Sequence, residues 1–247
     1  MGISQQGQFW DSVTEAAAPL VEARRLIEAL VPAAAIGDVL DAGCGAGDYS
    51  AAFTALGARR VAGFDVSAGS LRLARKRTPS GHFSQASLTH LPFPDQTFDV
   101  VWSWGVLHYV PDPVLALHEV TRVLRPGGVA VIHTLRAGFW SSLERTGAQV
   151  MCHTPGWVQP IMLSAGERLI PPLSQLITGR RPEELTSKTI RQKLHERLFV
   201  PGTTYTFSVE QLVLAFGSTM DTTEAHPPVA DLLKRDMSVT VVGRRKA

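Results

Sequence analysis

The sequence predicts an α/β protein in which helices cover both faces of a doubly wound, mostly parallel sheet. Short apolar runs alternate with helical patterns from residue 38 to residue 134, and repeated strand–helix units of this kind build parallel sheets. A glycine-rich turn follows the first apolar run directly, which is the position of the ligand-binding turn in open α/β sheets. The 247 residues suffice for one such domain and an insertion.

The spacing of apolar residues places the elements in order along the chain. Apolar side chains at three- and four-residue steps predict a helix over residues 11–31, which Pro32 and Gly37 end. Strands are expected over residues 38–42, 60–64, 82–86, 98–103 and 129–134. The intervening helices are expected over residues 49–56, 67–77 and 113–124. Ser67 is the expected N-cap of the second of these helices.

The alternation of strands and helices stops after Thr134. Residues 135–205 contain several prolines, and we interpret them as an insertion. The expected elements of the insertion are two helices, residues 161–170 and 183–198. The core pattern then resumes with a helix over Ser208–Phe216 and a strand over Met237–Gly243, and Arg244–Lys246 are expected to form a solvated tail.

Composition argues against several classes of function. The formal net charge of +2 gives no reason to expect nucleic acid as a partner. Cys44 and Cys152 are too few for a disulfide framework or a metal cluster, and they suit a reducing cytoplasm, where we expect the protein to reside. Residues 1–10 lack a secretory-signal pattern, and no apolar run reaches the roughly 20 residues of a membrane span.

The strongest local motif is the run Val39-Leu40-Asp41-Ala42-Gly43-Cys44-Gly45-Ala46-Gly47. Its glycines allow positive φ angles and let a ligand approach the backbone closely. Asp65 ends the next expected strand, where an acid can accept hydrogen bonds from both hydroxyls of a ribose; a turn or helix-capping aspartate is the alternative. The Gly-x-Gly-x-Gly spacing differs from the Gly-x-Gly-x-x-Gly of nicotinamide oxidoreductases, and no Gly-Lys-Ser/Thr of a triphosphate loop follows.

Six segments occur in the order of one known family. They are Val39–Gly47, Gly63–Ser67, Leu91–Asp95, Phe98–Val101, Val106–Pro113 and Leu124–Gly128. With them the chain resembles the class I S-adenosylmethionine-dependent methyltransferases, in the small-molecule branch that includes ubiquinone and sterol methyltransferases. The resemblance covers roughly residues 36–134 and implies a Rossmann-like sheet of about seven strands, with a helical insertion before the last two strands.

The resemblance also implies a role for each segment of the chain. The implied segments are an N-terminal helical lid (residues 1–32), a Rossmann-like cofactor-binding core (33–134), a helical insertion that caps the acceptor site (135–205) and the completion of the core (206–247). The implied cofactor-binding residues are Asp41, Gly43, Cys44, Gly45, Asp65, Val66, Ser87, Leu88, Ser103 and Trp104. One departure stands out, because the family usually has an acid followed by a small residue where this chain has Ser87-Leu88.

Candidates for catalysis and acceptor binding come partly from the resemblance and partly from the positions of residues in the expected sheet and insertion. His108 and His133 are the candidate catalytic bases, although a structural role is the alternative for each. The candidate substrate-binding residues are Trp10, Tyr109, Trp140 and Trp157, and packing is the alternative for Tyr109. The basic surplus of the insertion suits an acidic or phosphorylated acceptor, and its aromatic residues suit a partly apolar one.

The sequence therefore predicts a methyltransferase that uses S-adenosylmethionine to methylate an oxygen, nitrogen or carbon of a small molecule by in-line displacement. Because the sulfonium cofactor is already activated, the protein mainly supplies alignment and desolvation. The alternatives are a non-catalytic module that keeps the fold for assembly or regulation, and a nicotinamide oxidoreductase. The acceptor and the oligomeric state do not follow from the sequence.

Overall fold

The computed structural model describes residues 7–8, 10–11, 20–138, 157–158, 160–161, 164–165, 205–226 and 238–246. The chain divides into two compact units, Met1–Ser141 with Gly202–Ala247, and Ser142–Pro201. The fold and the site below belong to the first unit. Most of the helix expected over residues 161–170 and all of the helix expected over 183–198 lie outside the described residues.

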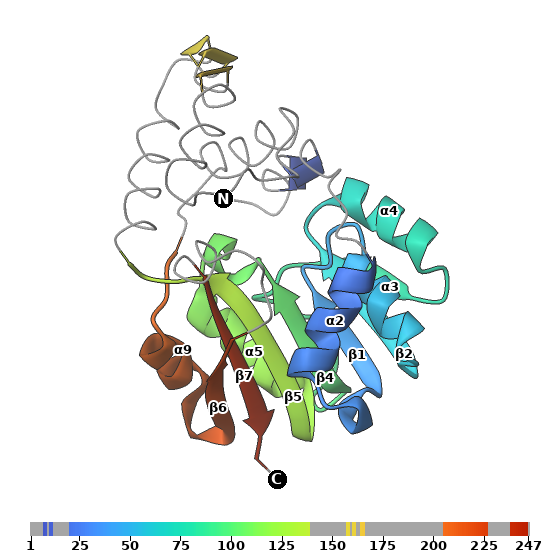
Figure 1. Cartoon of the computed structure of the whole chain (residues 1–247), viewed down its shortest axis with the longest axis vertical. Helices are drawn as coiled ribbons and strands as arrows, with labels where there is room; N and C mark the ends of the chain where they lie inside the picture. The colour runs from blue at the N-terminus through green and yellow to red at the C-terminus, as the bar shows by residue number, and fades with distance from the viewer. Residues whose placement is uncertain are drawn as a thin grey trace. The chain divides into compact units, whose positions relative to one another are not determined.

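Seven strands form one mixed sheet, as the sequence predicts (Figure 1). They are β1 (Asp38–Ala42), β2 (Arg60–Asp65), β3 (His82–Gln85), β4 (Phe98–Trp104), β5 (Leu124–Leu135), β6 (Met220–Ala225) and β7 (Ser238–Arg245). Their order in the sheet is β3-β2-β1-β4-β5-β7-β6. The strands β1 to β5 run parallel to one another, whereas β7 runs antiparallel to both β5 and β6. The carboxyl ends of β1 to β5 therefore share one edge.

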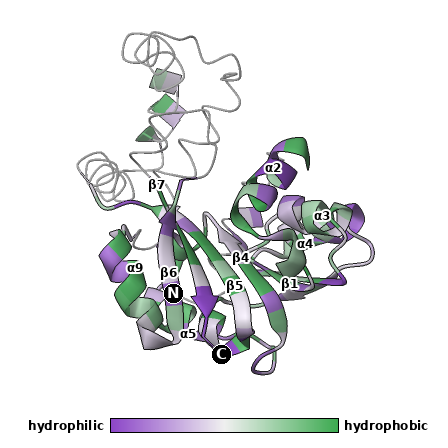
Figure 2. Ribbon diagram, turned by 60° about the horizontal axis from the view of Figure 1, so that its bottom comes forward, coloured by the Kyte–Doolittle hydropathy of each residue, from purple (hydrophilic) through white to green (hydrophobic). Residues whose placement is uncertain are grey.

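Helices cover both faces of this sheet. The α-helices are α2 (Leu20–Leu30), α3 (Asp48–Ala55), α4 (Ala68–Arg77), α5 (Pro113–Val123) and α9 (Val209–Phe216). The short 3₁₀ helices are η1 (Ala33–Ala35), η2 (Leu107–Tyr109) and η3 (Gly217–Thr219). One core cluster joins α2 and α3 to the sheet, and another joins α5 and α9 to the opposite face. In Figure 2, α9 shows both green and purple segments, as a helix with one apolar face should.

Local signals set several helix ends. Ser67 caps α4 as expected, because its hydroxyl accepts the backbone N–H of Ser70. Ser208 forms a capping box with Gln211 at the start of α9. No helix within the described residues combines the length and the hydrophobicity that crossing a bilayer requires.

The structure corrects the sequence-based prediction for the two carboxyl-terminal strands. The pattern does not locate β6, because it is an edge strand on which Met220 is the only buried residue. The tail prediction is wrong for Arg244 and Arg245, which belong to β7. The Arg245 guanidinium donates to the backbone carbonyls of Thr121 and Leu124, at the end of α5. A cation at this position is favourable because the carboxyl end of a helix carries partial negative charge.

A buried carboxylate ties the amino ends of the strands together. Asp38, at the start of β1, is 1% exposed. It accepts hydrogen bonds from Arg59 (2.6 Å), from Arg60 (2.6 Å) and from Arg125 (3.0 Å). The backbone N–H of Asp38 donates to the carboxylate of Asp99 on β4 at 2.7 Å. Hydrogen bonds from the arginines hold the pKa of Asp38 far below its usual range.

We expect Asp38→Asn to lower the free energy of unfolding by about 2 kcal/mol at pH 7. Removing one partner of a buried ion pair costs roughly 3–5 kcal/mol, and solvent around the arginines reduces this cost. Because the pKa of Asp38 is depressed in the folded state, its contribution is present above the pKa of the unfolded chain and is lost on acidification. Urea unfolding should therefore show a smaller difference at pH 3 than at pH 7, and equal differences would contradict this account.

Candidate cofactor and acceptor site

The glycine turn after β1 combines tight packing with open space. Gly43, Gly45 and Gly47 have φ angles of 77°, 52° and 83°. A Cβ at Gly43 would lie 2.4 Å from the Val106 side chain, and a Cβ at Gly47 would lie 2.9 Å from Ala74 of α4. A Cβ at Gly45 would meet nothing within 4 Å among the described atoms. Packing thus requires glycine at positions 43 and 47, while Gly45 leaves its backbone open to a ligand.

Asp65 ends β2 directly beside this turn. One carboxylate oxygen accepts the backbone N–H of Gly45 and the other accepts that of Ser67, both at 2.9 Å. Burial raises the pKa of Asp65, and these backbone hydrogen bonds oppose the rise. Each carboxylate oxygen can accept a second hydrogen bond, so the group can hold the turn and still receive two ligand hydroxyls.

Asp41 places a second acid at the same turn. Its carboxylate is 2% exposed and accepts the Ser50 hydroxyl of α3 at 2.6 Å. Burial raises the pKa of Asp41 to about 7, and the nearby charge of Asp65 adds to the rise. A cationic ligand beside this carboxylate would favour its ionised form.

Four of the predicted residues form a row along the carboxyl edge. Asp65, Asp41, Trp104 and His133 come from the neighbouring strands β2, β1, β4 and β5. Side chains alternate between faces along a strand, so residues an even number apart share a face. Each of the four lies two or four residues after a side chain, on its own strand, that belongs to the core cluster with α2 and α3. In the same order, these core side chains are Val61, Val39, Trp102 and Val131. All four therefore lie on the α2/α3 face of the sheet.

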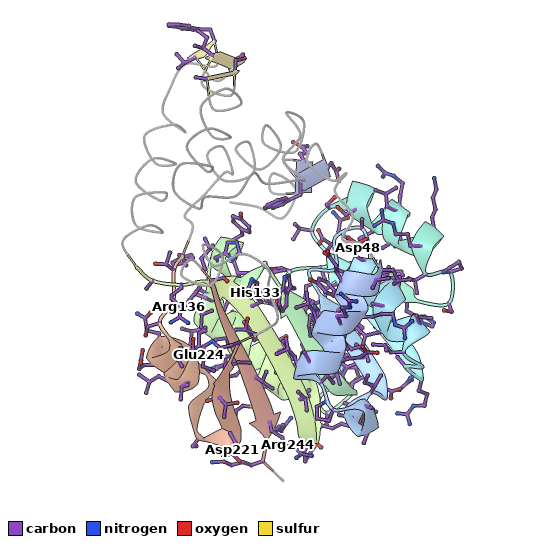
Figure 3. The ribbon with its side chains drawn as sticks, in the orientation of Figure 1. Asp48, His133, Arg136, Asp221, Glu224 and Arg244 are labelled. Carbon is purple, nitrogen blue, oxygen red and sulfur yellow. The ribbon has the colours of Figure 1, made fainter. Side chains whose placement is uncertain are left out.

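Ring stacking fixes the β4–β5 end of this row. Trp104 pairs with His133 across β4 and β5, and their rings stack with centroids 3.9 Å apart and planes 8° apart. Trp102 also stacks with Trp104, with ring centroids 5.2 Å apart. Nδ1 of His133 lies 2.8 Å from the hydroxyl of Thr240 on β7 (Figure 3 labels His133). These contacts set the plane and the direction of the imidazole.

His108 reaches the same edge on the opposite face. It lies in η2, is 6% exposed, and its Nδ1 is 3.2 Å from the hydroxyl of Thr134 on β5. Thr134 follows His133 directly and belongs to the other face, because neighbouring residues of a strand alternate. The two histidines are therefore not interchangeable, although the sequence suggests both as bases.

The remaining predicted residues have different surroundings. Ser103 is fully buried, and its hydroxyl has no hydrogen-bond partner among the described residues. The Ser87 hydroxyl lies 2.9 Å from that of Thr89, and the Leu88 side chain is buried in the α5/α9 core. The Cys44 thiol is buried, which raises its pKa, so it packs in the turn as expected.

The predicted aromatic residues are divided between the two units. Trp10 lies edge-on to Tyr109, with ring centroids 5.0 Å apart. Trp140 lies outside the described residues, and Trp157 belongs to the second unit. Sequence reasoning missed Thr134 and Thr240, the hydroxyl partners of the two histidines. A signal for Thr240 exists, since it is a polar residue inside an apolar strand pattern.

The residues present fit a nucleoside cofactor. Gly45 and Gly105 follow β1 and β4, both have positive φ, and a Cβ at either would meet nothing within 4 Å among the described atoms. Asp65 ends the strand on the other side of β1 and carries a partly buried carboxylate with capacity for two further hydrogen bonds. Ligands of open α/β sheets bind at this edge.

Comparison with known proteins identifies the domain. Residues 40–132 match the model of the methyltransferase domain family. Residues 40–132 therefore form a methyltransferase domain. The resemblance found in the sequence, its Rossmann-like fold and its cofactor are thereby confirmed for this domain.

The curated relatives match less than half of the chain. A malonyl-[acyl-carrier protein] O-methyltransferase of Yersinia pestis is 38% identical over 112 residues, which are 45% of this chain and 42% of that protein. A probable S-adenosylmethionine-dependent methyltransferase of Mycolicibacterium smegmatis is 41% identical over 97 residues, 39% of this chain and 37% of that protein. The matches thus span less than half the length of these relatives.

Solved structures share the fold over most of the chain. An S-adenosylmethionine-dependent methyltransferase of Mesorhizobium loti has a TM-score of 0.58 at 23% identity, covering 92% of this chain and all of that one. The PH0226 protein of Pyrococcus horikoshii also has a TM-score of 0.58, at 20% identity, covering 99% of this chain and 100% of that one. At these identities the likeness concerns the fold of the methyltransferase domain.

We expect Asp41→Asn to remove a pH dependence of stability. Because the folded pKa of Asp41 is raised to about 7, the folded state holds a proton that the unfolded chain releases near pH 4. The free energy of unfolding of the wild type should therefore fall between pH 4.5 and 7.5, relative to the variant, by up to about 4 kcal/mol. Urea unfolding across this range checks the difference, and parallel profiles would disprove the assignment.

Proposed function

We propose that this chain transfers the methyl group of S-adenosylmethionine to a small-molecule acceptor. The observation that carries the proposal is the row of Asp65, Asp41, Trp104 and His133 on one face of the carboxyl edge. Two acids beside a glycine turn suit the ribose and the positive charge of this cofactor, and a stacked histidine stands two strands away from the nearer acid. When bound, the cofactor supplies a methyl group activated by a sulfonium.

Within this proposal each residue has a defined task. Asp65 holds the ribose hydroxyls with its remaining lone pairs, and Asp41 provides negative charge near the turn. Gly45 lets the cofactor approach the backbone. Trp104 and His133 face the acceptor, where the fixed imidazole orients the attacking atom or takes its proton.

A carboxylate-bearing acyl group is the first acceptor to test. Relatives of this domain include enzymes named malonyl-[acyl-carrier protein] O-methyltransferases. A carboxylate is ionised at neutral pH and needs no base before it attacks, so His133 would orient it by hydrogen bonding. The expectation that residues 135–205, with Trp140 and Trp157, cover the acceptor remains part of this proposal. The expected cytoplasmic location is also part of it.

The non-catalytic alternative makes a different prediction. A module that keeps the fold for assembly would bind cofactor without turnover, and no contact described here favours it. A nicotinamide oxidoreductase would bind a dinucleotide in place of S-adenosylmethionine, and the Gly-x-Gly-x-Gly turn argues against it. Calorimetry with both cofactors, together with a turnover assay, separates the three functions.

Asp65→Ala should weaken the binding of S-adenosylhomocysteine at least about tenfold. Hydrogen bonds to a charged group contribute about 1.5 kcal/mol or more each, and about 1.4 kcal/mol corresponds to a factor of ten. Asp112→Ala is the matched control, because Asp112 also accepts a backbone N–H at a helix start but caps α5. Isothermal calorimetry decides the matter, and equal affinities of wild type and Asp65→Ala would refute the assignment.

His133→Ala should slow turnover about 100-fold while changing the affinity for S-adenosylhomocysteine less than twofold. Loss of a group that positions the acceptor lowers the rate without removing cofactor contacts. His133→Gln keeps a hydrogen-bonding group but cannot titrate, so it should retain activity toward a carboxylate and lose it toward an acceptor that must be deprotonated.

Release of S-adenosylhomocysteine measures these rates. His108→Ala provides the comparison from the opposite face of the sheet, where we expect a smaller effect on kcat and a larger effect on the apparent KM of the acceptor. Full activity of His133→Ala would show that His133 does not belong to the acceptor site.

A further inference from the structure

The hydroxyl of Thr240 reaches His133 from the neighbouring strand. Thr240 on β7 pairs directly with His133 on β5, so both side chains lie on the α2/α3 face of the sheet. The hydroxyl lies 2.8 Å from Nδ1 of the imidazole. Thr240 is 2% exposed, so its hydroxyl is shielded from water. The direction of this hydrogen bond depends on which ring nitrogen carries the proton of the neutral imidazole.

The hydrogen-bonding capacity of Thr240 decides that direction. Within the described part of the chain, Nδ1 of His133 is the only hydrogen-bond partner of the Thr240 hydroxyl. If Nδ1 carried the ring proton, it would donate to the hydroxyl oxygen, and the hydroxyl hydrogen would be buried without an acceptor. A buried donor without an acceptor is costly and rarer than an oxygen with a spare lone pair. The hydroxyl therefore donates to Nδ1, and the ring carries its proton on Nε2.

Two contacts of the imidazole prevent it from turning. Stacking on Trp104 fixes the plane of the ring, and the hydrogen bond to Thr240 fixes which edge of the ring faces β7. A flip of the ring within its plane would place a carbon where Nδ1 lies and would leave the hydroxyl without its acceptor. Nε2 is thus the nitrogen through which the ring acts on a ligand.

The ends of the surrounding strands are fastened next to this hydrogen bond. The Arg136 guanidinium binds the carboxylate of Glu224 on β6 (Figure 3 labels both residues). It also donates to the backbone carbonyl of Ser238 on β7 at 3.3 Å. Arg136 follows His133 by three residues, and Ser238 precedes Thr240 by two. Arg136 therefore holds β5, β6 and β7 together beside the pair of Thr240 and His133.

We propose that Thr240 is a positioning residue that keeps the proton of His133 on Nε2, so that the site suits an acceptor that is already anionic. The Nε2–H group can hold and orient a carboxylate by a charge-assisted hydrogen bond. It cannot remove a proton from a hydroxyl or an amine, because Nε2 already carries one.

A carboxylate acceptor needs no such proton transfer. One carboxylate oxygen forms a bond to the methyl carbon while the bond between that carbon and sulfur breaks, and the electron pair of the broken bond goes to sulfur. The product is a methyl ester, and no proton moves. The choice of acceptor rests on the proposed function, but the tautomer of His133 does not.

Nuclear magnetic resonance tests the tautomer without cofactor or turnover. In protein with nitrogen-labelled histidines, the ring signals of His133 are assigned by their loss in His133→Gln. At about pH 8.5, well above the usual histidine pKa, the ring is neutral, and its two nitrogen signals report which atom carries the proton. The wild type should carry the proton on Nε2, and a proton on Nδ1 would overturn the proposal.

Variants of Thr240 show whether its hydroxyl sets the tautomer. Thr240→Val keeps the branched shape but removes the hydroxyl, so the ring should become a mixture of both tautomers. Thr240→Ser keeps the hydroxyl and should restore the wild-type signals. Thr223→Val is the matched control, because it makes the same change at an exposed position of β6. A Thr240→Val ring that still carries its proton on Nε2 alone would also overturn the proposal.

The choice between two acceptors tests the consequence for the reaction. Malonyl-pantetheine carries a terminal carboxylate, and hydroxypropionyl-pantetheine carries a hydroxyl in its place. Release of S-adenosylhomocysteine should occur with the malonyl compound alone. Thr240→Val should lower kcat/KM for this compound about fivefold, the effect of losing one net hydrogen bond, while cofactor affinity changes by less than about twofold. Methylation of the hydroxyl compound, or of neither compound, would overturn the assignment of an anionic acceptor.

The two kinds of measurement separate this proposal from the proposed function. If the wild type binds no S-adenosylhomocysteine, the proposed function falls, while His133 signals that respond to Thr240→Val still support the positioning role. If the wild type methylates an acceptor but carries the His133 proton on Nδ1, the role of Thr240 falls and the function stands.

Discussion

The parallel register of β2, β1, β4 and β5 determines which side chains meet at the carboxyl edge of the sheet. Asp41 pairs with Gly63 of β2, and Trp104 pairs with His133, so the row on the α2/α3 face follows from these pairings. A slip of one residue would turn every side chain of a strand to the other face. The arginines that bind Asp38 join the amino ends of β1, β2 and β5 and thereby resist such a slip.

The features that could be predicted from the sequence are those encoded by neighbouring residues. The glycine turn, Asp65 at a strand end and the caps Ser67 and Ser208 each depend on a few adjacent positions, and the structure shows them where the sequence places them. The strands β1, β4 and β5 follow from apolar runs long enough to be buried on both faces. The cofactor could be predicted because the glycine turn that contributes to the family resemblance is a local motif.

The features that could not be predicted depend on pairings between distant residues. His133 and Thr240 are separated by 107 positions, so their contact appears only when β7 lies beside β5. Arg245 has the composition of a solvated tail, yet its guanidinium binds carbonyls 121 to 124 residues earlier in the chain. His108 lies in a 3₁₀ turn whose direction no periodicity reveals, and this direction decides which face of the sheet it joins.

The position of β7 in the sheet has a consequence for synthesis of the protein. β7 follows β5 and β6 in the chain but lies between them in the sheet. Until residues 238–245 leave the ribosome, β5 has an open edge and β6 lacks the neighbour with which it pairs. Unpaired edges of this kind are templates for association with other chains. The nascent domain therefore exposes two unpaired strand edges until its central antiparallel strand arrives.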